Sequence, residues 1–244
     1  MAAFEGAVRL GYRFLETDVQ ATSDGVLAVF HDHDLTPVSS GRGQISEMTW
    51  AEVSHARVGG EPIPRLEELL DAFDDVRISI DPKTDTSVEP LIAALRRPGV
   101  LDRVCVGSFS DNRLARMDEA LGDAVCLSFS PREIARLRVL SASPLRKART
   151  LRRRDRPFRG RIASIPLRQG VIPLATRRLV EFAHRSGIAV YAWIIDDPAE
   201  MQRLLDLGID GIMTDEPKVL TEVMAARGLW PPAADGPPAE GALT

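Results

Sequence analysis

Residues 14–32 read FLETDVQATSDGVLAVFHD, and this stretch sets the architecture of the chain around it. Its two halves have the alternating or continuous apolar pattern of β-strands, and the Asp-Gly step between them is typical of a hairpin turn. If the strands fold back about residues 23–25, the numbers of facing residues sum to about 49, which sets Asp18 opposite His31. Because strand side chains alternate between two faces, Glu16 shares a face with Asp18.

Two chemical interpretations of this hairpin are open. In the first, the carboxylates of Glu16 and Asp18 converge with the imidazole of His31 and offer the oxygen ligands that a hard divalent cation prefers. In the second, the hairpin lies on the surface, its acids are solvated and the histidine is incidental. The segment alone does not separate these interpretations.

The composition is that of an ordinary globular protein. The chain has 244 residues, of which 44% are apolar and 27% charged, enough for one large domain with a sizeable core. A net charge of −4 gives no general attraction to nucleic acid, and no apolar run reaches the roughly 18 residues of a membrane span.

Cysteine usage and the first residues bear on location. Cys105 and Cys126 lie inside apolar runs that read as buried strands, so neither a disulfide framework nor a zinc site is expected. Residues 1–5 lack the basic start and apolar core of a signal peptide. A cytoplasmic protein in a reducing compartment is therefore predicted.

Strand and helix patterns alternate along the chain, which is typical of α/β proteins. Short connections favour a (β/α) barrel with its active site at the carboxyl ends of the strands. An open doubly wound sheet is less well supported, because no Gly-rich phosphate loop follows a strand. The predicted strands are 14–20, 76–81, 103–108, 124–128, 162–166, 188–194 and 211–214, with 26–31 as a hairpin arm. The predicted helices are 3–10, 65–73, 88–95, 112–120, 131–140, 175–186, 198–207 and 217–226.

The domain organisation follows from this rhythm. Residues 1–228 are predicted to form a single barrel domain, in which 33–64 interrupts the pattern and is interpreted as a cap-like insertion over the site. The nine basic residues in 146–161 either attract phosphate groups or belong to a solvated linker. Residues 229–244 are rich in Pro, Ala and Gly and are predicted to be disordered.

Polar residues lie toward or just after the carboxyl ends of the predicted strands. They are Glu16, Asp18, Asp81, Lys83, Ser108, Trp193, Asp196, Thr214 and Asp215. In a barrel these positions share one mouth, so the candidate site gathers there.

The same residues form an ordered series of motifs that resembles the glycerophosphodiester phosphodiesterases from about residue 4 to residue 220. The motifs are Glu16-Thr17-Asp18-Val19-Gln20, Ser23-Asp24-Gly25, Phe30-His31-Asp32, Gly41-Arg42-Gly43, Ile80-Asp81-Pro82-Lys83, Gly107-Ser108-Phe109, Trp193 and Gly211-Ile212-Met213-Thr214-Asp215-Glu216-Pro217. So many motifs in order are a far more specific signal than any one of them.

The resemblance implies a TIM barrel of the phospholipase C-like phosphodiesterase type, with a small insertion after its second strand. It implies metal-dependent hydrolysis of a small glycerophosphodiester to glycerol 3-phosphate and an alcohol, a reaction of glycerol and lipid metabolism. The implied cation is magnesium or calcium, and manganese also suits all-oxygen ligation. By position, its ligands would be Glu16, Asp18 and Asp81, although many relatives have glutamate in place of Asp81.

Other roles also follow from the resemblance and from phosphoryl chemistry. Lys83 would neutralise phosphoryl oxygens, and His31 would carry a proton because the ordinary pKa of histidine is near neutrality. The substrate-binding residues would be Lys83, Trp193 and Ser108. Where relatives have asparagine in the tryptophan motif, this chain has Asp196.

The resemblance departs from the family at the start. Family members open with a strand that ends in a His-Arg-Gly motif and continue through Glu-Asn-Thr, and the chain has neither before its first predicted helix. This predicts a barrel lacking its first strand and one acid/base histidine, with impaired activity in the chain as given. Two alternatives are a non-catalytic protein that binds the metal and phosphate, and a Schiff-base aldolase that uses Lys83. The sequence does not specify the leaving alcohol, the metal or the oligomeric state.

Overall fold

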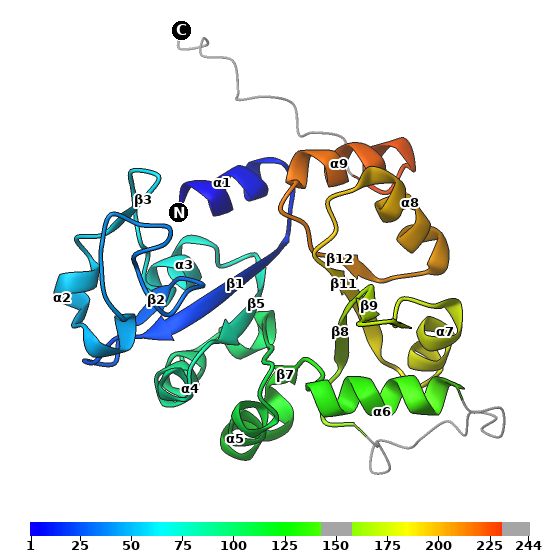
Figure 1. The fold of residues 1–244 in the computed structure, drawn as a ribbon, viewed down its shortest axis with the longest axis horizontal. Helices are drawn as coiled ribbons and strands as arrows, with labels where there is room; N and C mark the ends of the chain where they lie inside the picture. The colour runs from blue at the N-terminus through cyan, green and yellow to red at the C-terminus, as the bar shows by residue number, and fades with distance from the viewer. Residues whose placement is uncertain (143–157, 231–244) are drawn as a thin grey trace, which may run out of the picture.

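The computed structural model describes residues 1–142 and 158–230 (Figure 1). Most of the predicted basic linker and all but two residues of the tail predicted to be disordered lie outside this range. Within it, no helix has both the length and the apolarity needed to cross a membrane.

Parallel strands form the centre of the molecule, in two hydrogen-bonded sheets. Every one of the seven predicted parallel strands is present, within a few residues of its predicted ends. The first sheet places β1 beside β5, β6 and β7, and the second places β8 beside β11 and β12. A parallel bridge between Ser128 and Ile162 continues the order from β7 to β8, so β1 and β12 are its two ends. The strands are β1 (Phe14–Ala21), β5 (Arg77–Pro82), β6 (Val104–Val106), β7 (Cys126–Leu127), β8 (Ile162–Pro166), β11 (Ala189–Trp193) and β12 (Gly211–Ile212).

Helices alternate with these strands and surround them, which is the (β/α) barrel arrangement (Figure 1). All eight predicted helices are confirmed. Local sequence fixes several of their ends: the side chains of Ser110, Thr176 and Asp197 each accept an orphan backbone N–H of the first turn. The helices are α1 (Ala2–Arg9), α3 (Leu66–Ala72), α4 (Val88–Leu95), α5 (Asp111–Leu121), α6 (Pro131–Ala142), α7 (Arg177–Arg185), α8 (Pro198–Leu207) and α9 (Pro217–Ala226).

The hydrophobic core lies between strands and helices. On β1 the residues Leu15, Thr17 and Val19 are buried, and the two apolar ones join a cluster with Ile80 of β5 and Leu91 of α4. Burying each such aliphatic side chain contributes about 1.5–3 kcal/mol. Because the apolar set of β1 points outward to the helices, the alternate residues of β1 point into the barrel, as predicted.

The hairpin exists, but its predicted register is wrong by one residue. β2 (Leu27–Val29) pairs antiparallel with β1 so that Val19 faces Val29, and the carbonyl of Asp18 accepts from the backbone N–H of Phe30. The turn is centred on Asp24 itself, and Gly25 has a φ of +82° that favours glycine.

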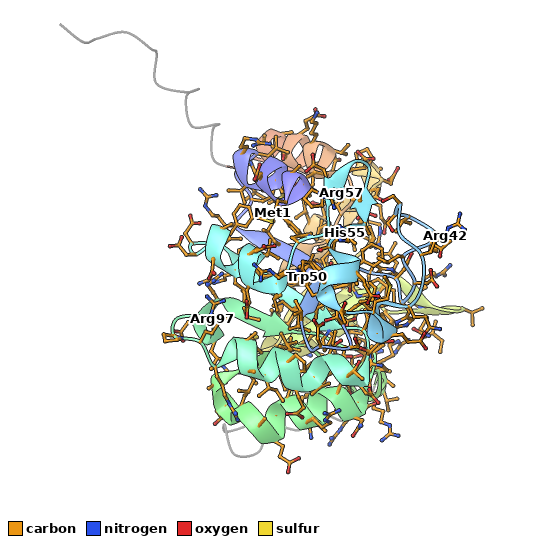
Figure 2. All side chains as sticks on the ribbon, turned by 90° about the vertical axis from the view of Figure 1, so that its left-hand side faces the viewer. Met1, Arg42, Trp50, His55, Arg57 and Arg97 are labelled. Atoms are coloured by element: carbon orange, nitrogen blue, oxygen red, sulfur yellow. The ribbon has the colours of Figure 1, made fainter. Side chains whose placement is uncertain are left out.

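Residues 33–64 form a small unit beside the barrel rather than only a loop. Its side chains Leu35, Ile45, Val53, Ala56 and Ile63 bury a cluster of their own with Ala28 and Phe30 of the hairpin. Figure 2 looks onto this side, with Trp50, His55 and Arg57 at its surface. Its short elements, which the sequence pattern did not predict, are η1 (Ile45–Glu47), α2 (Trp50–Val53), β3 (Arg57–Val58) and β4 (Glu61–Pro62).

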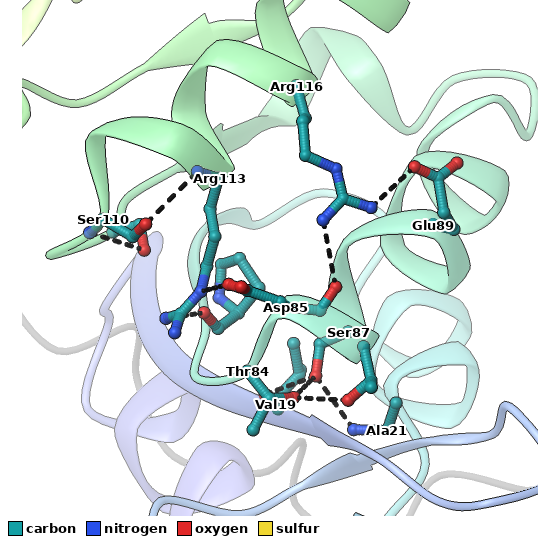
Figure 3. Close-up of polar contacts among 12 residues, drawn as sticks. Val19, Ala21, Thr84, Asp85, Ser87, Glu89, Ser110, Arg113 and Arg116 are labelled. Atoms are coloured by element: carbon teal, nitrogen blue, oxygen red, sulfur yellow. Dashed lines mark hydrogen bonds and ion pairs between the residues drawn. The ribbon is translucent and has the colours of Figure 1, made fainter.

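Short helical turns complete the connections between strands. They are η2 (Asp85–Ser87), η3 (Leu101–Arg103) and η4 (Gly122–Ala124). Through η2 the end of β5 is tied to β1, because the buried Ser87 hydroxyl accepts from the backbone N–H of Ala21 at 2.9 Å (Figure 3). Arg113 of α5 bonds Asp85 and the carbonyl of Pro82 at the same point.

Replacing Ser87→Ala should lower the free energy of unfolding by about 1–3 kcal/mol, because the buried N–H of Ala21 loses its acceptor. Urea denaturation followed by circular dichroism measures this change. Thr86→Ala, at an exposed position of the same turn, is the control. Equal stability losses in the two variants would contradict this role of Ser87.

Candidate active site

The site is built where β1 and β5 pair. Their parallel register makes Asp18 and Asp81 direct neighbours, and Glu16 lies two residues earlier on the same face of β1. The Lys83 ammonium lies 2.7 Å from Asp18 Oδ1 and 3.6 Å from Asp81 Oδ2. The side chains of these three charged residues are only 13–19% exposed. A cation therefore lies between two nearly buried carboxylates.

The electrostatics of the site are those of crowded acids. Burial, followed by the charge of Asp18, raises the pKa of Glu16 to about 8, while Lys83 opposes the shift. The Glu16 side chain as a whole is exposed, but protein atoms surround its carboxyl group. Burial also raises the pKa of Asp81 to about 6, again against the effect of Lys83. The net charge of the cluster thus favours an additional cation.

The pKa of Lys83 is raised as well, which for an amine favours the charged form. Burial alone would lower the pKa of Lys83, but its hydrogen bond to Asp18 and the charges of Asp81, Asp18 and Glu16 outweigh burial and raise it. Lys83 is therefore a firmly charged ammonium, which argues against the Schiff-base alternative, since that chemistry needs a neutral amine.

The carboxylates of this cluster have the donor chemistry of a divalent-cation site. Asp81 Oδ1 is buried and has no hydrogen-bond partner among the described residues, which is costly for a carboxylate oxygen. Three carboxylates within one cluster supply the hard oxygen ligands that Mg²⁺ or Ca²⁺ uses. In residues 1–142 and 158–230 no three acidic, histidine or cysteine side chains are already closed around a metal-sized position. The residues fit the cation in chemistry, while Lys83 bridges two of the donors.

A second edge of the mouth is organised by Asp196. Its Oδ1 accepts from the Thr214 hydroxyl and from the backbone N–H of Asp215, both at 2.9 Å. The carboxylate of Asp215 is close enough to contribute to the raised pKa of Glu16. The loop after β12 is thereby fixed beside the acids of β1.

His31 lies outside the acid cluster. Its side chain is 72% exposed, and its Nδ1 is 2.6 Å from Asp32 Oδ1. Gln20, which is buried on the same face of β1 as Asp18, donates its side-chain amide to the His31 carbonyl and contacts the His33 ring. The one-residue register difference explains this placement, because Phe30 rather than His31 lies opposite Asp18.

The remaining predicted residues lie at the mouth without a hydrogen bond or ion pair to the acids in the described part of the chain. Ser108 is buried after β6, where its hydroxyl accepts from the N–H of Ser110. Trp193 ends β11 and meets Phe109 edge-on, with ring centroids 5.7 Å apart. Sequence analysis missed the supporting roles of Gln20 and Asp32, although a glutamine on the acid-bearing face of a strand was the available signal.

A barrel that gathers carboxylates and an ammonium where β1 and β5 pair has the groups of a metal-assisted phosphoester hydrolase. The chain belongs to the glycerophosphoryl diester phosphodiesterase family, whose model matches residues 1–219. Members of this family generally depend on a divalent metal.

The chain is similar to several individual proteins. It is 38% identical over 231 residues to a probable glycerophosphodiester phosphodiesterase 2 of Mycobacterium tuberculosis, covering 94% of this chain and 86% of that protein. The crystal structure of a glycerophosphoryl diester phosphodiesterase from Silicibacter pomeroyi matches with a TM-score of 0.77 and 24% identity, over 95% of this chain and 90% of that one. A phosphodiesterase of Oleispira antarctica, solved with the product sn-glycerol-3-phosphate, matches with a TM-score of 0.71 and 19% identity, over 92% of this chain and 90% of that one. These likenesses confirm the TIM-barrel fold.

Glu16→Gln should stabilise the metal-free protein at pH 8 by roughly 1 kcal/mol, a figure already reduced for solvent screening, or about 2–4 °C in Tm. The pKa of Glu16 in the folded state, about 8, lies above its ordinary value of 4.5 in an unfolded chain. The folded state therefore binds the proton more tightly, and the free energy of unfolding falls as the pH rises from about 4.5 toward 8. Glutamine removes this loss, so the gain should vanish at pH 4.5. Thermal melts in chelator at both pH values measure it.

The control for this experiment is Glu67→Gln, at an exposed carboxylate on α3. Its effect on Tm should be the same at both pH values. A Glu16→Gln effect that is also independent of pH would contradict the electrostatic account of the cluster.

Proposed function

We propose that this chain hydrolyses glycerophosphodiesters to glycerol 3-phosphate and an alcohol. The observation that carries the proposal is the cluster of Glu16, Asp18, Asp81 and Lys83, which lies where β1 and β5 pair in a barrel of this family. The product bound to the Oleispira antarctica relative is what this reaction would release.

The carboxylates of Glu16, Asp18 and Asp81 would hold a divalent cation, with magnesium, calcium or manganese as the candidates. When bound, the cation supplies Lewis-acid stabilisation of the negative charge on the phosphoryl oxygens. Support comes from Asp81 Oδ1, which has no hydrogen-bond partner in the part of the chain that the structure describes, and from the raised pKa values of Glu16 and Asp81. Asp81 has a shorter side chain than the glutamate of many relatives, and its pairing with Asp18 across the ladder keeps its carboxylate at the cluster.

Lys83 binds and orients the phosphodiester. Its ammonium is already charged and is held by Asp18 at 2.7 Å, so it is directed before substrate arrives. An ammonium fixed in this way stabilises charge that grows on the phosphoryl oxygens without the reorganisation that free solvent would need. Ser108 and Trp193 are proposed to line the glycerol side of the same pocket.

His31 would exchange a proton with the attacking or leaving oxygen. Asp32 holds its Nδ1 at 2.6 Å, so Nε2 would be the atom that exchanges the proton. A carboxylate that orients an imidazole is a recurring arrangement in acid–base catalysis. Gln20 fixes the backbone of the same residue from within the barrel.

The domain boundaries and the location are also proposals. Residues 1–228 would act as one catalytic domain, and residues 33–64 would select the leaving alcohol as a cap. This assignment is supported by the separate hydrophobic cluster of that segment. A cytoplasmic location is proposed because Cys105 and Cys126 are facing residues of β6 and β7 yet are free thiols.

Asp81→Asn and Lys83→Met should each lower kcat for release of glycerol 3-phosphate from glycerophosphocholine by about 10²–10³-fold. A chelator should abolish the wild-type rate, and Mg²⁺, Ca²⁺ or Mn²⁺ should restore it. An enzyme-coupled glycerol 3-phosphate assay measures all three. Binding of glycerophosphocholine by calorimetry without any product would instead support the non-catalytic alternative.

His31→Gln should lower kcat by about 10²–10⁴-fold with little change in KM, because it removes proton transfer and keeps the polarity of the position. His33→Gln is the matched control, since His33 is a neighbouring exposed histidine with no orienting carboxylate among the described residues. Comparable losses in both variants, or none in His31→Gln, would contradict the role of His31.

A further inference from the structure

The peptide bond that joins Pro82 to Lys83 is held at both of its polar atoms. The backbone N–H of Lys83 donates to the Val19 carbonyl at 3.0 Å, and the Pro82 carbonyl accepts from Arg113 Nη1 at 3.0 Å. Because a peptide bond is planar, bonds to its N–H and its C=O together fix the orientation of the plane. A strand, β1, and a helix, α5, thus set the position from which the Lys83 side chain begins.

Pro82 makes the second of these bonds important. Proline has no backbone N–H, so its carbonyl is the only backbone group through which Pro82 can be hydrogen-bonded. Pro82 is also buried, and a buried carbonyl that loses its donor pays for its desolvation. Arg113 supplies this donor at the point between Asp81 and Lys83. Its loss would therefore free the peptide plane that precedes Lys83.

Arg113 is itself held in place. Its side chain is only 21% exposed, and its Nε donates to Asp85 Oδ1 at 2.7 Å (Figure 3). At the start of α5 its backbone N–H donates to the Ser110 hydroxyl at 3.3 Å. A guanidinium is planar with its donors in a fixed geometry, so the bond to Asp85 also orients Nη1 toward the Pro82 carbonyl. Arg113 is a rigid support rather than a freely moving surface cation.

We propose that Arg113 is a positioning residue for the phosphodiester reaction, an inference that rests on the proposed function. Arg113 holds the Pro82–Lys83 peptide so that the Lys83 ammonium stays between the carboxylates of Asp18 and Asp81. The lysine side chain is long and flexible, so a fixed backbone reduces the range of positions that its ammonium can reach. Its charge then acts at one place, where small displacements of a catalytic group are costly.

Steady-state hydrolysis of glycerophosphocholine tests the effect on rate. Arg113→Gln should lower kcat by about 10- to 100-fold, because the Lys83 ammonium is displaced from the position where it stabilises developing charge. The double variant Arg113→Gln/Lys83→Met should be no slower than Lys83→Met, because Arg113 acts through Lys83. A residue with an independent structural role would instead slow both backgrounds by the same factor.

The matched control is Arg116→Gln. Arg116 lies three residues further along α5 and is tied to the same turn, but it bonds the carbonyl of Asp85 and the carboxylate of Glu89 (Figure 3). It does not support the peptide that precedes Lys83. Its kcat should therefore equal that of the wild type.

Amide hydrogen exchange followed by NMR tests the support of Lys83 without depending on activity. Arg113→Gln should speed exchange of the Lys83 amide by at least about tenfold, because its bond to Val19 opens more often. The amide of Ile195, which donates to Met213 after β11, reports on the rest of the barrel and should exchange at the wild-type rate. Arg116→Gln should leave both amides unchanged.

Several results would overturn the role of Arg113. These are unaltered exchange at Lys83 in Arg113→Gln, equal acceleration at Ile195, a rate loss shared by Arg116→Gln, and a double variant that is slower than Lys83→Met by the full factor of Arg113→Gln. Absence of hydrolysis in the wild type would overturn the proposed function. The exchange of the Lys83 amide would then still decide whether Arg113 holds this peptide.

Discussion

The structure depends on one electrostatic arrangement, in which the Lys83 ammonium lies between the carboxylates of Asp18 and Asp81 at the end of two paired strands. Three acids on neighbouring positions would repel one another, and their burial adds to that cost. The positive charge of Lys83 offsets part of this electrostatic cost. The part that is not offset raises the pKa of Glu16 to about 8, through burial first and the charge of Asp18 second. Perturbed carboxyl groups of this kind are typical of functional sites.

The barrel makes this arrangement possible by keeping its apolar and polar faces apart. The same alternation that sends Leu15 and Val19 outward to the helices sends Glu16 and Asp18 inward. The register of β1 against β5 fixes which acids are neighbours. Asp18 and Asp81 are partners in the ladder and cannot separate without breaking it. Ser87 adds a second connection between these strands through the backbone of β1. The position of the acids is therefore a property of the strands and not of mobile loops.

Much of the fold was predictable from local patterns, because each strand and helix carries its own period and its own capping residues. Ser110, Thr176 and Asp197 illustrate this at helix starts. The hairpin register was not predictable to the residue. A turn centred on Asp24 and a turn shifted by one residue differ only in backbone geometry, which the apolar pattern of the strands does not report. The hairpin of β9 (Arg168–Gln169) and β10 (Ile172–Pro173) and the short elements of residues 33–64 were also missed, because their two- to four-residue segments are too short to show a period.

The candidate site was predictable in part for the same reason. The convergence of Asp18, Asp81 and Lys83 follows from their positions at strand ends, whereas the side-chain direction of His31 depends on the register that the pattern did not resolve. The most direct test of the central claim is the anomalous scattering of a crystal of this chain soaked in Mn²⁺. The account predicts one strong peak within direct coordination distance of carboxylate oxygens from Glu16, Asp18 and Asp81. A peak elsewhere, with these three carboxylates free of metal, would contradict it.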